Sequence, residues 1–376
     1  MTLWQDIVGQ PRAVEQLTRA AASPAPAHAW LLTGPPGSGR SSAALAFAAA
    51  LLCQEQEGGC GNCRSCHTVL KGSHADLTFF STENMHITID QARELVVLSQ
   101  DRPSVGRWRI IIVEDADRMP ERTSNVLLKA IEEPPPQTIW LLCAPSPADV
   151  LITIRSRCRM VGLQVPPLAE VAALLVRRDK VQPDLARHCA SLAQGHVGVA
   201  RRLALDPQAL ARREKVVQLP LTVQSVPSAM AAAEQLIDIA EQEAAADAQE
   251  RNEAERAELL TVLGIQEGQE VNPSLRSQLR QLEDDQKRRA RRIKTDTLDR
   301  FLIDIQTVFR DVMTLQLNTG SALINSHLEQ ELKSFAAAST ASKTLAHLDT
   351  VALTRRRICT NASARLAFEA MLTSLL

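Results

Sequence analysis

The stretch Gly34-Pro-Pro-Gly-Ser-Gly-Arg-Ser-Ser42 decides the fold of this chain. It follows an apolar run at residues 28–33 and precedes an alanine-rich apolar run at 43–52, so it lies between a predicted strand and a predicted helix. This order is typical of a phosphate-binding loop, because glycines let successive backbone N–H groups turn toward an anion. The first turn of the helix adds partial positive charge. We predict a nucleotide-type loop; the alternative is a plain Gly/Pro turn.

One residue departs from the pattern G-x-x-x-x-G-K-[ST]. Arg40 stands where the pattern has lysine, whereas Ser41 keeps the hydroxyl that holds Mg²⁺. A lysine ammonium is slim and reaches the β- and γ-phosphates, but an arginine is a wide planar fork, so the exchange is not conservative. We therefore expect a degenerate nucleotide site. Its loop residues are Gly34, Pro35, Pro36, Gly37, Ser38, Gly39, Arg40, Ser41 and Ser42.

The composition is that of a soluble globular protein. The 376 residues suffice for two or three domains, and the net charge of −1 gives no general attraction to nucleic acid. Aromatic residues are only 3% and tyrosine is absent, so base-stacking platforms are not expected. No apolar run approaches the ~18 residues of a membrane span, and the N-terminus does not resemble a secretory signal. We expect a cytoplasmic location, where thiols stay reduced.

Four cysteines follow the first predicted helix with the spacing C-x6-C-x2-C-x2-C: Cys53, Cys60, Cys63 and Cys66. Overlapping C-x-x-C pairs with glycines between them are the parts of a closed tetrahedral zinc site, which leaves no open position for water. We predict structural Zn²⁺. The alternatives are a redox dithiol, unrelated free thiols, or a DNA-binding knuckle, for which only Arg64 and Lys71 supply charge.

Apolar strand-like runs then alternate with helical patterns. The predicted strands are 76–80, 109–113 and 138–143, and Thr88 is the expected cap of a helix between the first two. Such alternation predicts an α/β fold with a parallel sheet covered on both faces.

Two carboxylates, Glu114 and Asp115, follow the strand at 109–113. In a phosphate-loop protein this is the expected place for Mg²⁺ binding and water activation. The usual order is Asp then Glu, so here each carboxylate is displaced by about one bond, ~1.5 Å, which is costly for catalysis. The alternative is an acidic turn.

At this point the sequence resembles a family. Trp4 with Val8-Gly9-Gln10, the loop, the cysteine insert, residues 125–135 and Ser156-Arg157-Cys158 resemble bacterial AAA+ clamp-loader subunits of the DNA polymerase III holoenzyme. The motifs appear in order over residues 1–202, and the resemblance is looser beyond. It adds Val8 and Gly9 to the degenerate nucleotide site.

The resemblance also implies a division into domains. Residues 1–166 would form an AAA+ P-loop module with the zinc insert at 53–66. Residues 167–219 would form a helical lid, and residues 220–376 an all-α collar that holds the subunits together.

Further departures place the chain within the family. Ala144 and Pro145 lie near the expected sensor threonine, and Gly198 lies near the expected lid arginine. Losses at several parts of one ATPase site resemble the stator branch of this family, which does not hydrolyse ATP itself. The loop would either hold ATP-Mg²⁺ without turnover or bind none.

The resemblance gives Arg157 a role in catalysis, as an arginine finger that reaches the ATP of a neighbouring gamma/tau subunit. An arginine supplied in trans can raise such a rate by ~10³–10⁵. Arg155, Arg157 and Arg159 alternate, so in an extended segment they would share one face. The alternative is a solvated surface charge.

The implied partners are gamma/tau and delta subunits, and through them the sliding clamp and primer-template DNA. No membrane partner is expected. Two other hypotheses remain: an active P-loop ATPase motor of gamma/tau type, and a zinc scaffold protein that binds no nucleotide.

The second half of the chain is helical in pattern. A linker is predicted at 220–227, long helices at 228–263 and 275–317 with a break at 264–273, and a last helix at 362–376 whose apolar side includes Leu366, Ala370, Met371 and Leu375. The basic run 287–294 either binds DNA or is an exposed face balanced by nearby acids: Glu283, Asp284, Asp285, Asp296 and Asp299.

Overall fold

The computed structural model describes residues 3–82, 84–262, 273–360 and 362–376. The chain forms two compact units, Met1–Leu205 and Asp206–Leu376.

The first unit is built on a five-stranded parallel sheet with the order β2-β3-β4-β1-β5. The central strands β1 (Ala29–Thr33), β3 (Arg109–Val113) and β4 (Thr138–Ala144) are buried along their whole length, as near-continuous apolar runs require. β2 (Leu77–Phe80) and β5 (Arg159–Gly162) form the edges. The predicted parallel sheet is confirmed.

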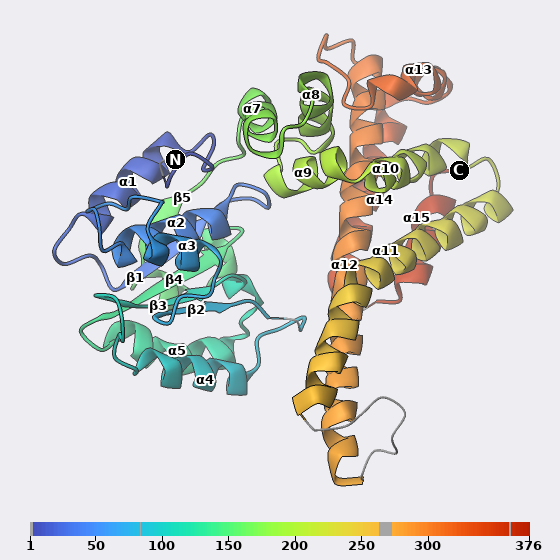
Figure 1. Ribbon diagram of the computed structural model, residues 1–376. Helices are drawn as coiled ribbons and strands as arrows, with labels where there is room; N and C mark the ends of the chain where they lie inside the picture. Colours follow the sequence, from blue (N-terminus) through green and yellow to red (C-terminus); the bar gives the residue numbers. More distant parts are fainter. Residues whose placement is uncertain (1–2, 83, 263–272, 361) are drawn as a thin grey trace. The chain divides into compact units, whose positions relative to one another are not determined.

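Helices cover both faces of this sheet (Figure 1). Alternate strand residues point to opposite faces, so Trp30 and Leu32 pack with α1 (Pro11–Ala21), α2 (Arg40–Leu52) and α3 (Arg64–Leu70). Leu31 and Trp140 enter a second core with α4 (Ile89–Ser99) and α5 (Glu121–Glu132). The predicted covering of both faces is therefore also confirmed.

Local sequence explains where these helices begin and end. Thr88 caps α4: its hydroxyl accepts from the Gln91 N–H, while the Gln91 side chain accepts from the Thr88 N–H. Helix α5 ends at Glu132 because the prolines at 134–136 cannot continue a helix.

Three short helices complete the first unit: α7 (Leu168–Asp179), α8 (Pro183–Leu192) and α9 (Val197–Leu205). They enclose a small core of their own around Val171, Leu175 and Ala190. The predicted lid, residues 167–219, is thus divided between the two units, since its last helix, α10 (Pro207–Gln218), falls in the second.

A buried arginine explains where α10 belongs. Arg213 on α10 donates from Nε to Asp304 at 2.8 Å and from Nη2 to the Asn325 side chain at 3.0 Å. Both partners lie in the second unit, and a buried arginine needs such partners.

The second unit is helical throughout its described secondary structure. The long helices α11 (Val226–Val262) and α12 (Pro273–Gln316) pack on one another, and α13 (Glu329–Ala338), α14 (Ala341–Cys359) and α15 (Ala364–Thr373) pack beside them. Leu302, Ile305 and Phe309 of α12 lie in the core, on the apolar stripe that the sequence predicts. Within the described residues no helix is both long and apolar enough to span a membrane.

Some predicted details of this unit differ. The segment 220–227 contains a short 3₁₀ helix, η3 (Leu219–Thr222), and the start of α11. On α15 the core side chains are Ala367, Phe368, Met371 and Leu372, whereas Leu366, which lies on the predicted apolar side, is 66% exposed. The predicted break at 264–273 lies outside the described residues, apart from Pro273.

Candidate functional site

The glycine loop connects β1 to α2, with Gly37 and Gly39 in the left-handed region at φ of +83° and +89°. Position 37 tolerates only glycine for a second reason: a Cβ there would lie 2.2 Å from Cγ of His196, which precedes α9. The Ser38 N–H donates to the Pro35 carbonyl at 3.1 Å. Two loop residues are therefore fixed by intramolecular contacts: Gly37 by His196, and Ser38 by the Pro35 carbonyl.

Arg40, at the lysine position, turns back onto the loop. Its Nη1 donates to the carbonyl oxygen of Gly34 at 2.5 Å, so the guanidinium is engaged by the backbone. Ser41 behaves differently, because its hydroxyl donates to Oε1 of Glu114 at 2.5 Å. The strand end and the loop thus bring these two side chains together despite the reversed acidic order.

Of the predicted residues Val8 and Gly9, Val8 is half-buried and Gly9 lies against the start of α7. The Gly9 N–H donates to Glu170 Oε2 at 2.6 Å, and a Cβ at position 9 would lie 2.7 Å from Cδ of Pro167. Gln10 links the glycine loop to the segment before α7, since its side-chain amide donates to the carbonyls of Ser38 and Gln164. Of the remaining loop positions, Gly34 is buried, whereas Pro35, Pro36 and Ser42 are exposed.

Acidic and basic groups converge at the end of β3. Asp115 lies 4.0 Å from Arg118, and burial raises the pKa of Asp117, with the nearby charge of Asp115 acting in the same direction. Burial also raises the pKa of the Cys143 thiol on β4 to about 12.

Arg157 lies between α6 (Ile152–Arg155) and β5, with its side chain 36% exposed. Its Nε and Nη2 contact Oε1 of Glu132, and its Nη1 donates to the Thr153 carbonyl at 2.7 Å. The arginine is therefore at the surface, but it is held by its own chain.

The predicted alternation of Arg155, Arg157 and Arg159 on one face is wrong, because the segment is not extended. Arg155 ends helix α6 and donates to the Pro147 carbonyl at 3.2 Å. Arg159 begins β5, and its guanidinium lies 5.2 Å from the Trp30 ring centroid. The three side chains have three separate environments.

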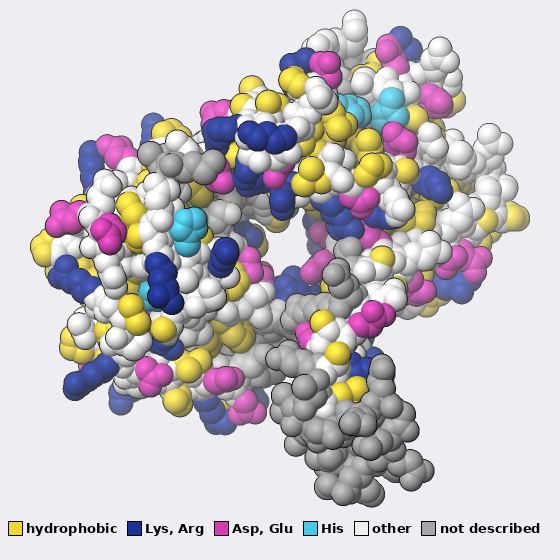
Figure 2. All heavy atoms as spheres, viewed as in Figure 1, with side chains coloured by type: hydrophobic (Ala, Val, Ile, Leu, Met, Phe, Trp, Pro, Cys, Tyr) yellow, Lys and Arg dark blue, Asp and Glu magenta, His cyan; other side chains and the backbone are white. Residues whose placement is uncertain are grey.

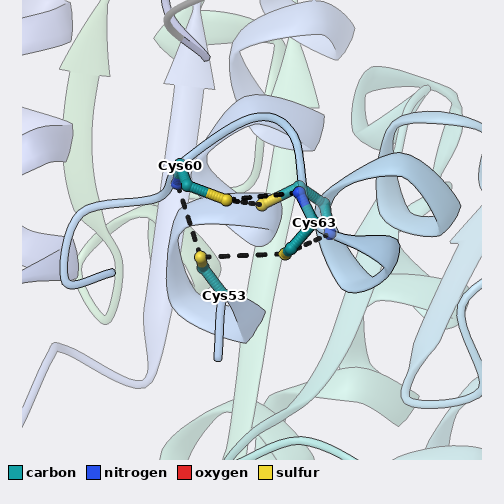
Figure 3. A group of neighbouring side chains, drawn as sticks. Cys53, Cys60 and Cys63 are labelled. Atoms are coloured by element: carbon teal, nitrogen blue, oxygen red, sulfur yellow. Dashed lines mark hydrogen bonds between the residues drawn. The ribbon is translucent and has the colours of Figure 1, made fainter. Parts of the chain in front are cut away.

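Cys53, Cys60, Cys63 and Cys66 come together between α2 and α3, with their sulfur atoms all within 4.8 Å of one another (Figure 3 labels three of them). Backbone N–H groups of Asn62 and Cys63 donate to the Cys60 sulfur at 3.4 and 3.3 Å. The Cys66 N–H likewise donates to the Cys63 sulfur at 3.4 Å. Tight turns that direct N–H groups at sulfur favour the thiolate form.

These residues fit a metal ion by their donor set. The N–H donors from Asn62 and Cys63 lower the pKa of Cys60 to about 6, whereas burial raises the pKa of Cys66. Four sulfur ligands at such spacing suit tetrahedral zinc. The cluster could hold a zinc ion.

Buried polar contacts anchor the insert to the end of α2 and to the segment before β2. Ser65 on α3 donates to the Leu52 carbonyl at 2.8 Å and lies 3.2 Å from Nε2 of His74. Nδ1 of His74 accepts the Asp76 N–H at 3.0 Å, so Nε2 carries the proton. Ser, His and Asp are the residue types of a catalytic triad, but the hydrogen bonds of Ser65, His74 and Asp76 join segments of the fold.

The basic run 287–294 is paired with neighbouring acids. Asp285 contacts Arg288, Asp284 lies 3.6 Å from Lys287, and Asp296 lies 3.4 Å from Arg292. Two further acids pair with other helices, Glu283 with Arg256 and Asp299 with Arg355.

On the first unit, Lys and Arg side chains lie interspersed with Asp and Glu on the face seen in Figure 2.

The strand order, the glycine loop and the loop-to-strand contact of Ser41 and Glu114 define a class: an α/β P-loop module of the AAA+ type. Residues 9–167 match the model of the family described as "DNA polymerase III, delta subunit". Over this segment the chain is similar to that family, and the relatives that it matches include DNA polymerase III delta' subunits and tau/gamma subunits.

Two relatives illustrate the match. DNA polymerase III subunit delta' of Pseudomonas aeruginosa (strain PAO1) is 37% identical over 162 residues, covering 42% of this chain and 48% of that protein. The Escherichia coli (strain K12) subunit delta' is 32% identical over 180 residues, covering 47% and 54%. The matched segment thus spans about half the length of these relatives.

The tau/gamma subunit of Haemophilus influenzae is also similar, at 28% identity over 220 residues, which cover 56% of this chain and 31% of that protein.

Sequence reasoning missed three residues at these sites: Glu132 beside Arg157, Glu170 on the Gly9 N–H, and His196 against Gly37. Only Glu132 gave a sequence signal, since it falls within the family-like stretch 125–135. Glu170, on α7, contacts the Gly9 N–H, and His196, which precedes α9, lies against Gly37 of the loop, so both come from segments that follow the sheet in the chain.

Proposed function

We propose that this protein is the non-hydrolysing stator, the delta prime subunit, of a cytoplasmic DNA polymerase III clamp loader. In this role it binds gamma/tau and delta subunits and supports loading of the sliding clamp on primed DNA. Arg157 is its contribution to catalysis, as a finger donated to the ATP site of a neighbouring gamma/tau subunit.

The contrast between two arginines supports this proposal. Arg157, in an intact Ser-Arg-Cys motif, presents a partly exposed guanidinium outside the nucleotide loop of its own chain. Arg40, inside that loop, is engaged by the Gly34 carbonyl. A guanidinium near a γ-phosphate neutralises charge that develops in the transition state, so an exposed arginine can act on a site that its own chain does not form.

The loop itself supports a role without turnover. The lysine ammonium is replaced, the Ser38 N–H bonds to Pro35, and the acidic pair stands in the reversed order. These features leave the chain without a well-placed phosphate ligand and water-activating group, so any ATP-Mg²⁺ bound there is retained rather than hydrolysed.

The four cysteines hold structural Zn²⁺ in this proposal. The ion would join the end of α2 to the start of α3 and supply local folding free energy, as closed four-thiolate sites do. No step of ATP chemistry depends on it.

The test is ATP hydrolysis by the complex reconstituted with cognate gamma/tau-type and delta-type subunits, with clamp and primed DNA. Arg157→Ala should leave assembly intact, as seen by gel filtration, and lower DNA-stimulated turnover. Arg155→Ala is the matched control, because its guanidinium bonds to its own chain's Pro147 carbonyl and should change turnover little.

Unchanged turnover with Arg157→Ala would overturn the finger assignment. Brisk hydrolysis by the isolated chain would favour the motor hypothesis instead. Failure to form any complex with the two subunit types would favour the zinc scaffold hypothesis.

A further inference from the structure

We infer that Glu132 is the positioning residue of Arg157: its carboxylate orients the guanidinium before a neighbour's nucleotide is engaged. The inference rests on the proposed function, because it assumes that Arg157 acts in trans. It concerns a residue that no motif of the phosphate site includes.

The contacts fix both the plane and the direction of the guanidinium. Oε1 of Glu132 accepts from Nε and Nη2, along one edge of the group. Nη1 donates to the Thr153 carbonyl at 2.7 Å and, more weakly, lies 3.4 Å from the Ser156 hydroxyl. Acceptors on two sides of a planar group leave it little freedom to rotate.

Glu132 is itself well placed to hold a partner. It is the last residue of α5, where the following prolines end the helix, so its backbone position is fixed by the fold. Thr153 belongs to α6, which packs against α5. The side chain of Arg157 is thus bonded to both α5 and α6, which pack on one another.

Stability alone does not account for this pair. The side chains of Arg157 and Glu132 are 36% and 41% exposed, and ion pairs at such exposure contribute little to folding. Orientation is the effect that remains, because a free arginine loses much rotamer entropy when it is ordered on a phosphate.

The carboxylate does not have to leave for a phosphate to bind. A guanidinium carries five N–H donors, and the four contacts named above use at most four of them. The remaining N–H can therefore donate to a phosphate oxygen while Glu132 keeps its contacts with Nε and Nη2.

The experiment compares Glu132→Ala, Glu132→Gln and Glu133→Ala in the reconstituted complex with clamp and primed DNA. Glu133 is the matched control, since it is the adjacent exposed acid and lies one position past α5. Glu132→Ala should lower kcat for DNA-stimulated ATP hydrolysis, by up to ~10²-fold, with KM for ATP little changed, because a ~1 Å misplacement of a catalytic group can cost that much. Glu132→Gln should recover part of the loss, since its amide oxygen still accepts.

A double variant separates this inference from the proposed function. Glu132→Ala combined with Arg157→Ala should be no slower than Arg157→Ala alone, because the carboxylate acts only through the arginine. If Arg157→Ala slows turnover but Glu132→Ala does not, or if Glu132→Ala raises turnover as removal of a latch would, the positioning role is wrong and the finger stands. If Arg157→Ala has no effect, the proposed function fails first.

Discussion

Nη1 of Arg40 donates to the carbonyl oxygen of Gly34 at 2.5 Å, so the side chain at the loop's lysine position is bonded to the loop itself. The isolated chain should therefore turn over ATP no faster than background, measured as phosphate release. Arg40→Lys should not restore turnover, because the reversed order of Glu114 and Asp115 is unchanged.

Binding of labelled ATP to the two proteins refines this prediction. A lysine at position 40 can reach the phosphates, so Arg40→Lys should bind ATP at least as tightly as the wild type without hydrolysing it. Recovery of hydrolysis in Arg40→Lys would show that the arginine alone had disabled the site.

The thiol cluster predicts one tightly bound zinc ion per chain, measured by metal analysis of the purified protein. Cys60→Ser should lose the ion and lower the thermal unfolding temperature, since a closed site contributes to folding. Cys158→Ser is the control, because Cys158 packs at the other core of the sheet and should keep the metal. A folded wild type that contains no metal would contradict this prediction.

Features encoded in short stretches could be predicted from the sequence. The β1–loop–α2 unit, the Thr88 cap and the convergence of four cysteines each depend on residues close together in the chain. The parallel sheet could be predicted because its buried strands are short, continuous apolar runs that alternate with helical patterns along the chain.

Contacts between distant segments could not be predicted in this way. Glu170 binds Gly9 across 161 positions, and Arg213 binds Asp304 across 91, so neither leaves a local pattern. The prediction that Arg155, Arg157 and Arg159 share one face was wrong, because alternate residues share a face only in an extended strand. Here the short helix α6 ends at Arg155, so the segment is not extended.

Asp76 should stabilise the first unit through hydrogen bonds to its carboxylate. It accepts from the N–H groups of Ser104, Val105 and Gly106, and although burial opposes ionisation, these bonds lower its pKa from 3.8 to about 2. A lowered pKa means that this stabilisation is fully present above about pH 4 and is lost as pH falls toward 2.

Asp76→Asn, which keeps one acceptor oxygen and loses the charge, should reduce the free energy of unfolding by about 2 kcal/mol at pH 6. The difference from wild type should narrow as pH approaches 2, measured by denaturant unfolding. Asp90→Asn is the control, because Asp90 is an exposed partner of Arg93 and should cost little. A difference that stays constant with pH would show that the carboxylate charge is not the cause.

The paired charges of α12 predict that the run 287–294 stabilises helix packing and does not bind DNA. Arg289 is buried and binds Glu255 on α11 through two bonds, Nη1–Oε1 at 2.7 Å and Nη2–Oε2 at 2.6 Å. Arg289→Ala should reduce the free energy of unfolding by about 2 kcal/mol, because it leaves a partly buried carboxylate without this partner. Lys287→Ala, at an exposed side chain, should cost much less.

Primed DNA binding by the full chain, followed by fluorescence anisotropy at low and at physiological salt, decides between the two readings of the run. A DNA-binding face would lose affinity when Lys287 and Arg288 are both replaced by alanine, and its salt dependence would fall with the two lost phosphate contacts. Since both side chains lie against acids of their own helix, we expect the same affinity and the same salt slope as the wild type. A weaker affinity of the double variant for DNA, with a shallower salt dependence, would show instead that this helix binds DNA.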